Sequence, residues 1–230
     1  MLNIEYWSDY ACPFCYIGIT NLEKAIALAN MEDQVQLDMK SFELNPYASR
    51  SYSGPTVTRF AHKYGLSEGE AANRIEGISE MGRRAGLDFR YADTRYTNTF
   101  DAHRLHKLAQ KEFPDLVEAL NHALYKAYFT DGKELASHDV LLEVAKEIGL
   151  DAARVQQMLE SDEFAQDVRN DEAQASIAGV HAVPFFQIGN QIVNGAAAPG
   201  DLAKVLLSEA AKAEQQSLAG VSCSVNGCEI

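Results

Sequence analysis

Two cysteines close to the N-terminus carry the side chains best suited to covalent chemistry. They form the sequence Cys12-Pro13-Phe14-Cys15. Residues that alternate like a strand precede the pair, and residues with a helical period follow it. A CxxC between a strand and a helix is typical of a dithiol/disulfide centre and not of a zinc knuckle. The pair therefore predicts thiol–disulfide exchange.

The position of each cysteine predicts its role. Cys12 is expected at the N-terminus of the helix, where unpaired N–H groups and the helix dipole favour an anion. Because the thiolate is the attacking species, we expect Cys12 to be the nucleophile. Cys15 lies one turn further in, is better shielded, and is expected to resolve the mixed disulfide. Pro13 suits the first helical turn, and the uncharged Phe14 predicts a less oxidising pair than histidine would give.

A second pair, Cys223 and Cys228, lies near the C-terminus. Asn226-Gly227 between them is a tight-turn dipeptide that would let the two sulfurs meet. The pair is interpreted as an accessory redox shuttle, with a metal-binding pair or a passive tail as alternatives. All four cysteines could also form one tetrahedral zinc site, but that would occupy the nucleophile. We therefore expect no metal.

The elements that must position Cys12 follow from the hydrophobic period. Alternation predicts strands, a 3.6-residue period predicts helices, and Gly189-Asn190 is a hairpin turn signal. The expected elements are strands over 2–7, 35–44, 183–188 and 191–194, with helices over 13–30 and 199–213. A slip of phase near Phe42 indicates a bulge in the second strand.

Residues 45–178 contain no convincing strand and are expected to be entirely helical. Plausible N-caps are Ser67, Asn98, Ser137 and Asp151, and Pro114 is expected to open a further helix. The sequence thus predicts an α/β protein, a thioredoxin-like fold with an inserted all-helical domain. Its expected parts are a discontinuous thioredoxin-like domain over 1–44 and 179–214, a helical insertion over 45–178, and a cysteine-containing tail over 215–230.

Val183-Pro184 begins the late strand. A proline cannot donate to a strand ladder, so it requires an edge or a special turn. An ordinary trans edge proline is the alternative interpretation.

Composition excludes several classes of function. The 230 residues include 33 acidic and 20 basic side chains, a net charge of −13. This balance argues against nucleic acid as a partner, because phosphate binding needs clustered Lys and Arg. No apolar run reaches the roughly 18 residues of a membrane span, and the first residues do not resemble a secretory signal. If the chain is complete, we expect a cytoplasmic protein with no membrane partner.

Four motifs in order resemble a known family: WSDYACPFCYIG, NTFDAHRL, VPFF and the cysteine-containing tail. From about residue 2 to 214 the chain resembles the cytoplasmic DsbA-like oxidoreductases of the FrnE group, and a C-terminal cysteine pair like that of the tail also recurs in many of these proteins. The 2-hydroxychromene-2-carboxylate isomerases are relatives of that group. The resemblance implies disulfide exchange by Cys12 and Cys15, with a cis proline at Pro184 beside Val183 shaping the substrate groove. Partners would be protein or small-molecule thiols and disulfides.

Two departures from the family matter. The isomerases typically have serine where this chain has Cys12, which counts against isomerase activity. Thioredoxin and DsbA proteins place a buried acid six residues before the first cysteine, where this chain has Tyr6. Glu5 would serve as the proton acceptor only if the turn held an extra residue, and is otherwise an exposed strand carboxylate.

Three functions are therefore carried forward. The first is a thiol–disulfide oxidoreductase with no bound cofactor and with glutathione as a candidate co-substrate. The second is a glutathione-dependent isomerase or transferase acting on a small aromatic acid. The third is a chaperone-like binding protein. His103 and His106 share a helix face but lack a third ligand, so packing explains them better than a metal site.

Overall fold

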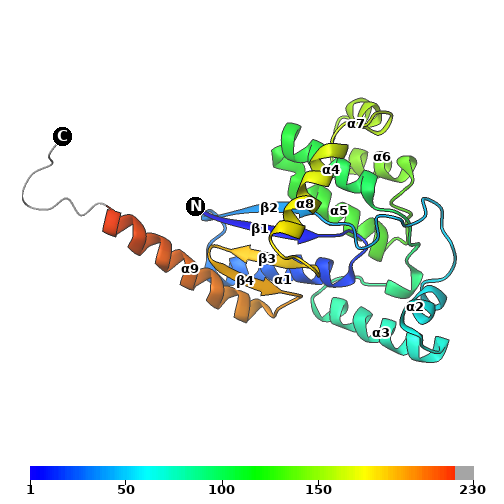
Figure 1. Cartoon of the computed structure of the whole chain (residues 1–230), viewed down its shortest axis with the longest axis horizontal. Coiled ribbons are helices and arrows are strands. Elements are labelled where there is room, and N and C mark those ends of the chain that lie inside the picture. Colours follow the sequence, from blue (N-terminus) through cyan, green and yellow to red (C-terminus); the bar gives the residue numbers. More distant parts are fainter. Residues whose placement is uncertain (221–230) are drawn as a thin grey trace, which may run out of the picture.

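Four strands form a single mixed sheet in the order β2-β1-β3-β4 (Figure 1). The computed structural model describes residues 1–220. β1 pairs in parallel with β2 and antiparallel with β3, and β3 forms a hairpin with β4. The bounds are β1 Leu2–Ser8, β2 Val35–Ser41, β3 Phe185–Ile188 and β4 Gln191–Asn194. The end of β1 thus leads directly into the Cys12 loop.

Helices cover both faces of this sheet. α1 (Pro13–Ala29) packs lengthwise against α9 (Pro199–Gly220), and α8 (Ala165–Ile177) packs against β2. Successive strand residues point to opposite faces, so Tyr6 faces α1 while Trp7 faces α8, where its Nε1 donates to the Asp171 carbonyl. The hydrophobic core therefore extends from the sheet into the helices on either side.

The segment between β2 and β3 is helical, as predicted; apart from α8, most of it lies toward one end of the sheet (Figure 1). Its remaining α-helices are α2 Thr56–Tyr64, α3 Glu68–Arg84, α4 Phe100–Glu112, α5 Val117–Phe129, α6 His138–Glu147 and α7 Ala152–Leu159. Two short 3-10 helices, η1 Tyr91–Asp93 and η2 Pro114–Leu116, connect them. The α/β fold class is confirmed, while the division into domains remains a prediction.

Three predicted boundaries are wrong. The third strand begins at Phe185 and not at Val183. The second strand ends at Ser41 without a bulge: Phe42 N still donates to Ser8 O, but Leu44 N donates to the Asp9 side chain instead of a strand. The last helix runs to Gly220, so residues 215–220 belong to it and not to a tail. Its sequence, rich in Ala, Glu and Lys, favours helix beyond the expected end. The cysteine-containing end lies outside the described residues.

The predicted caps are mostly confirmed. Ser67 begins α3 with a capping box, in which its hydroxyl accepts from Glu70 N and Glu70 accepts from Ser67 N. Asp151 caps α7 and Ser137 precedes α6. α4 begins one residue later than expected, after Thr99, although Asn98 Oδ1 still accepts from its first N–H. Among residues 1–220, no helix has the length and apolar character needed to cross a membrane.

Glu209 on α9 ties this helix to the β3–β4 turn and predicts a pH dependence. Its carboxylate accepts from Lys212 Nζ at 2.6 Å, Asn190 N at 2.9 Å and Gln191 Nε2 at 2.8 Å. These contacts, of which the hydrogen bond from Lys212 has the largest effect, lower the pKa of Glu209 to about 2. Because the pKa of Glu209 is lower in the folded than in the unfolded protein, its ionised carboxylate stabilises the fold at pH values above the unfolded-state pKa. This stabilisation is lost as the pH falls toward 2. We expect the destabilisation by Glu209→Gln, measured by urea unfolding, to shrink from pH 6 to pH 3; an unchanged difference would contradict this assignment.

Candidate active site

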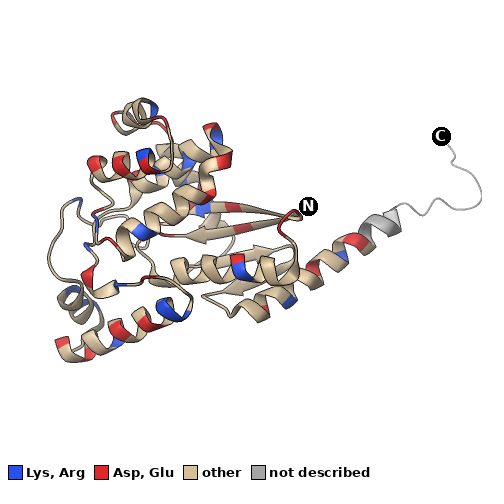
Figure 2. Ribbon diagram, turned by 180° about the vertical axis from the view of Figure 1, so that it is seen from behind, with Lys and Arg blue, Asp and Glu red and all other residues tan. Residues whose placement is uncertain are grey.

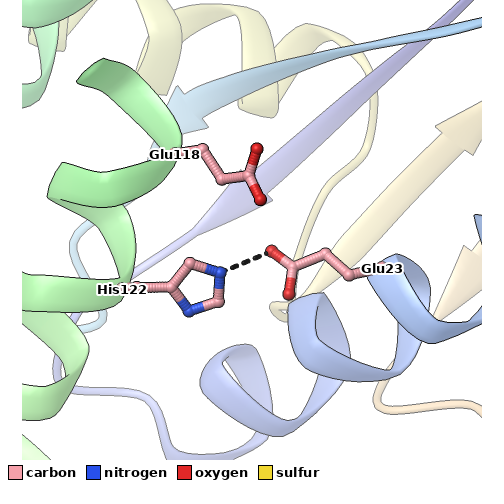
Figure 3. A group of neighbouring side chains, drawn as sticks. All are labelled: Glu23, Glu118 and His122. Carbon is pink, nitrogen blue, oxygen red and sulfur yellow. Dashed lines mark hydrogen bonds and ion pairs between the residues drawn. The ribbon is translucent and has the colours of Figure 1, made fainter. Parts of the chain in front are cut away.

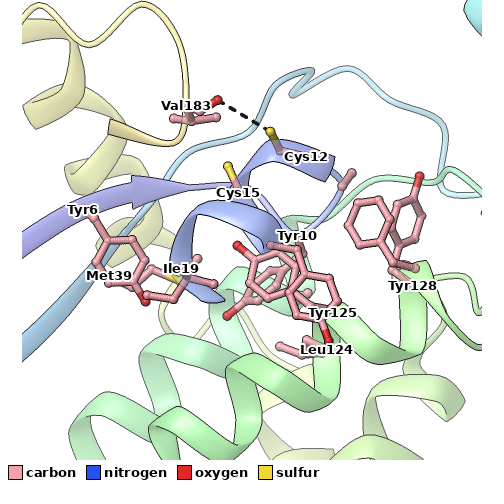
Figure 4. Packing of buried hydrophobic residues seen from close by; sticks show 14 of the residues in the cluster. Tyr6, Tyr10, Cys12, Cys15, Ile19, Met39, Leu124, Tyr125, Tyr128 and Val183 are labelled. Atoms are coloured by element: carbon pink, nitrogen blue, oxygen red, sulfur yellow. Dashed lines mark hydrogen bonds between the residues drawn. The ribbon is translucent and has the colours of Figure 1, made fainter. Parts of the chain in front are cut away.

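Cys12 occupies the N-cap position of α1. Its backbone is extended, with φ −90° and ψ 115°, and Pro13 opens the helix as predicted. The Cys12 thiol donates to the Val183 carbonyl, with Sγ 3.6 Å from the oxygen (Figure 4). No acidic residue lies in the first turn of α1. The helix N-terminus thus places Cys12 where a negative charge is favoured.

Cys15 lies one turn deeper and is fully buried. Burial raises the pKa of the Cys15 thiol well above its ordinary value, and the neighbouring Cys12 raises it further. Hydrogen bonds from the Ser8 side chain and the Asp9 backbone act in the opposite direction. Cys15 is therefore held as a neutral thiol next to Cys12, and the two sulfurs are not joined in this structure.

The loop before β3 faces these cysteines. The Val183–Pro184 peptide bond is cis, as the resemblance implied. Both residues are buried, and Val183 lines the cavity described below. Gly18 on α1 lets Pro184 approach closely: a Cβ at Gly18 would lie 2.9 Å from Pro184 Cγ and 3.3 Å from Phe186 Cζ. The position of the loop therefore depends on a missing side chain.

Gly18→Ala is expected to slow disulfide exchange, because the added methyl group must displace Pro184 or bend α1. Overpacking of this kind typically costs about 1–3 kcal/mol of stability. Exchange rate and melting temperature are to be measured together. The matched control is Gly69→Ala in α3, where a Cβ meets nothing within 4 Å. If Gly18→Ala behaved like Gly69→Ala in both measurements, the close packing of Pro184 would be irrelevant to the site.

A cavity of about 1020 Å³ opens beside Cys12. Four parts of the chain surround it: Ala11–Phe14, residues 44–45 after β2, the loop 181–183, and the helices α2 and α3 with the segment after them. Phe14, 37% exposed, lies at its edge as expected of a groove residue. Cys12 lines this cavity and Cys15 does not. An incoming disulfide would thus meet Cys12 first.

Asp9 is a buried carboxylate next to the cysteines that sequence reasoning missed. It is 1% exposed and lies in the loop between β1 and α1, three residues before Cys12. Its Oδ1 accepts from Thr99 Oγ1 at 2.8 Å and Ala11 N at 3.2 Å, and its Oδ2 accepts from Leu44 N at 2.7 Å. These bonds fix the loop before Cys12 to α4 and to the chain after β2. The available signal was a lone acid in the otherwise uncharged segment 6–16.

Glu5 lies on the other face of β1 from the cysteines. Side chains alternate along a strand, and Ser8, which contacts Cys15, points to the opposite face. Glu5 Oε1 lies 3.8 Å from Lys40 Nζ, and the Glu5 side chain is 37% exposed. The expectation that Glu5 tunes the cysteines is therefore wrong. It is the partly exposed strand carboxylate of the alternative interpretation.

His103 and His106 are packing residues in the core. His103 lies against Tyr10 with ring centroids 5.1 Å apart, and its Nε2 is 3.5 Å from Asp9 Oδ1. Burial lowers the pKa of His106 well below its ordinary value, with the charges of Lys107 and His103 adding to the effect. His106 is therefore neutral, as expected of a core residue.

One group of side chains among the described residues has metal-ligand types close together. Glu23 of α1 and Glu118 and His122 of α5 have ligand atoms within 4.8 Å of one another (Figure 3). The imidazole is already engaged, because His122 Nε2 lies 2.9 Å from Glu23 Oε1, and this contact raises the pKa of His122. An ion pair accounts for the arrangement without a metal. Cys223 and Cys228 lie outside the described residues.

The fold and the paired cysteines define a class of protein: a thioredoxin-like sheet with a CxxC dithiol at the start of its first helix and a cis proline opposite. The family model described as DSBA-like thioredoxin domain matches residues 3–207, and the chain belongs to this family. The predicted family and fold are thereby confirmed.

Individual relatives agree with this assignment. The chain is 26% identical over 217 residues to the uncharacterized protein YwbO of Bacillus subtilis, covering 92% of this chain and 98% of that protein. The crystal structure of the probable DsbA oxidoreductase SCO1869 from Streptomyces coelicolor matches with a TM-score of 0.85 and 31% identity, covering 100% and 99% of the two chains. The cytosolic disulfide reductase DsbM from Pseudomonas aeruginosa, solved with GSH, shares the fold at 16% identity, with a TM-score of 0.61 and coverage of 94% and 100%.

Proposed function

We propose that the protein is a thiol–disulfide oxidoreductase in which Cys12 attacks and Cys15 resolves. The observation that carries this proposal is the asymmetry of the pair. Both cysteines are buried, but Cys12 lines a large cavity at a helix N-terminus, whereas Cys15 does not reach the cavity and has a raised pKa that keeps it protonated. Pro13 and Phe14 hold the spacing of the pair. Val183 and Pro184 shape the opposite side of the groove.

The exchange requires no bound cofactor. The Cys12 thiolate attacks one sulfur of a substrate disulfide, a Cys12–S bond forms, and the departing thiolate takes a proton from water. Cys15 then gives its proton to solvent and attacks Cys12 Sγ. The Cys12–Cys15 disulfide forms, the bond from Cys12 to the substrate sulfur breaks, and the second substrate thiolate leaves and takes a proton from water. Two electrons pass from the dithiol to the substrate, and the reverse sequence oxidises a substrate dithiol. DsbM is a cytosolic disulfide reductase that was solved with GSH. Its bound GSH supports glutathione as a co-substrate here, and its cytosolic location supports a cytoplasmic location. Cys223 and Cys228 would pass electrons to or from the first pair.

The test is a stoichiometric reaction of the reduced protein with a disulfide-bonded peptide, followed by mass spectrometry of its own peptides. We expect the segment containing Cys12 and Cys15 to lose two hydrogens as the peptide is reduced. No reaction, combined with suppression of aggregation by the Cys12→Ser/Cys15→Ser variant, would favour the binding protein. Isomerisation of an aromatic acid that survives Cys15→Ser would favour the glutathione-dependent isomerase.

A further inference from the structure

The cavity beside Cys12 has a charge that differs from that of the whole chain. The chain carries a net charge of −13. Yet no aspartate or glutamate lines the cavity, while Arg59, Lys63 and Arg74 do. All three come from α2 and α3, the wall that faces the cysteines. A local cationic surface on an acidic protein concentrates anions where the overall field repels them.

The helical period explains how α3 presents this surface. Arg74, Ile78 and Met81 recur at intervals of three or four residues, so they lie on the face of α3 that lines the cavity. Glu76 and Glu80 lie on its other faces, where Glu76 pairs with Arg83 and Glu80 with Arg84. Glu70, one turn before Arg74, is engaged in the capping box with Ser67 and does not line the cavity. Acidic and basic residues are therefore mixed along α3 (Figure 2), but only a basic one reaches the cavity.

The three cations also lack carboxylate partners among the described residues. Across residues 1–220, none of Arg59, Lys63 and Arg74 forms an ion pair with a carboxylate. Arg59 is held in place by the Tyr96 ring, 4.2 Å from its Cζ, and its buried Nε has no hydrogen-bond partner. Lys63 and Arg74 are exposed. The wall thus offers a positioned guanidinium and two exposed cations to a ligand.

We propose that this wall selects the substrate by its charge: the preferred thiol or disulfide carries carboxylates a few bonds from its sulfur. The proposal rests on the proposed function, since Cys12 must react with the sulfur while Arg59, Lys63 and Arg74 hold the carboxylates. Phe60, Tyr64 and Ile78 provide the apolar surface between the two ends. Either a small thiol such as glutathione or an acidic peptide segment has this chemistry.

The test measures mixed-disulfide formation at Cys12 in a Cys15→Ser background, which isolates the first step. The probes are symmetrical disulfides of the peptides Cys-Glu-Glu and Cys-Lys-Lys, with oxidised glutathione as a third arm. We expect the glutamate peptide to react roughly tenfold faster than the lysine peptide. Reversing two exposed charges, in Lys63→Glu/Arg74→Glu, should bring that ratio below one. Rapid reaction of oxidised glutathione would identify a small thiol, and slow reaction an acidic peptide.

The matched control is Lys146→Glu on α6, an exposed lysine outside the cavity that likewise forms no ion pair among the described residues. It should keep the parent ratio. A parent ratio near one, or an equal change in ratio with Lys146→Glu, would overturn the charge selection and leave the oxidoreductase intact. If no probe forms a mixed disulfide with Cys12, the proposed function fails as well.

Discussion

Cys12→Ser is expected to slow disulfide exchange at least about a thousandfold, because serine cannot form the mixed disulfide through which the reaction passes. Cys15→Ser should instead trap that intermediate, since the first attack proceeds and the second does not. The asymmetry follows from the structure, in which Cys12 lines the cavity and Cys15 is buried beneath it.

The measurement is the amount of covalent adduct with a disulfide peptide, separated without reductant and located by mass spectrometry. We expect near-stoichiometric adduct on Cys12 in Cys15→Ser and none at this motif in Cys12→Ser. The circular dichroism of both variants should match that of the parent. Adducts of equal yield on either cysteine would contradict the assigned roles.

Asp171→Ala is expected to cost about 3–5 kcal/mol of unfolding free energy, because it strands a buried cation. Asp171 Oδ2 pairs with Lys107 Nζ and accepts from Ser41 N, the latter at 2.7 Å. Asp171 is 6% exposed and Lys107 8%. These contacts join α8 and α4 to β2 on the face of the sheet opposite α1.

Urea unfolding of three variants tests this prediction. Lys107→Met/Asp171→Leu should recover much of the loss, since it removes both charges together. Asp201→Ala, which breaks the exposed Lys204–Asp201 pair, should change stability little. If Asp171→Ala were no worse than Asp201→Ala, the buried pair would not be a determinant of stability.

Local sequence signals predicted the elements that hold the cysteines. Pro13 after a strand-like alternation marked the start of α1, and Gly189-Asn190 marked the β3–β4 turn; both lie where they were expected. These signals are reliable because a proline in a first helical turn and a hairpin dipeptide each determine the backbone conformation of only the few residues around them. Where tertiary contacts compete with strand pairing, the observed boundaries differ from the predicted ones. Leu44 lies outside the strand predicted for it because its N–H donates to Asp9.

The walls of the site could not be predicted in the same way. Arg59 and Arg74 belong to helices far along the chain, and only the packing of the helical segment brings them to the Cys12 cavity. The error at Glu5 has the opposite origin. The family pattern places an acid at the position of Tyr6, and Glu5 would fill that role only with an extra residue in the turn, whereas strand alternation turns Glu5 away from Ser8. Asp9 takes the buried position near the cysteines through bonds to Thr99 and Leu44 that no local pattern reveals.

The most direct test of the central claim is the alkylation rate of each cysteine in the reduced protein, followed by mass spectrometry at pH 7. The account predicts that Cys12 reacts first and that Cys15, buried and with a raised pKa, reacts only when the protein unfolds. Equal rates for Cys12 and Cys15, or a Cys12 protected until a chelator is added, would contradict the assignment of Cys12 as the nucleophile.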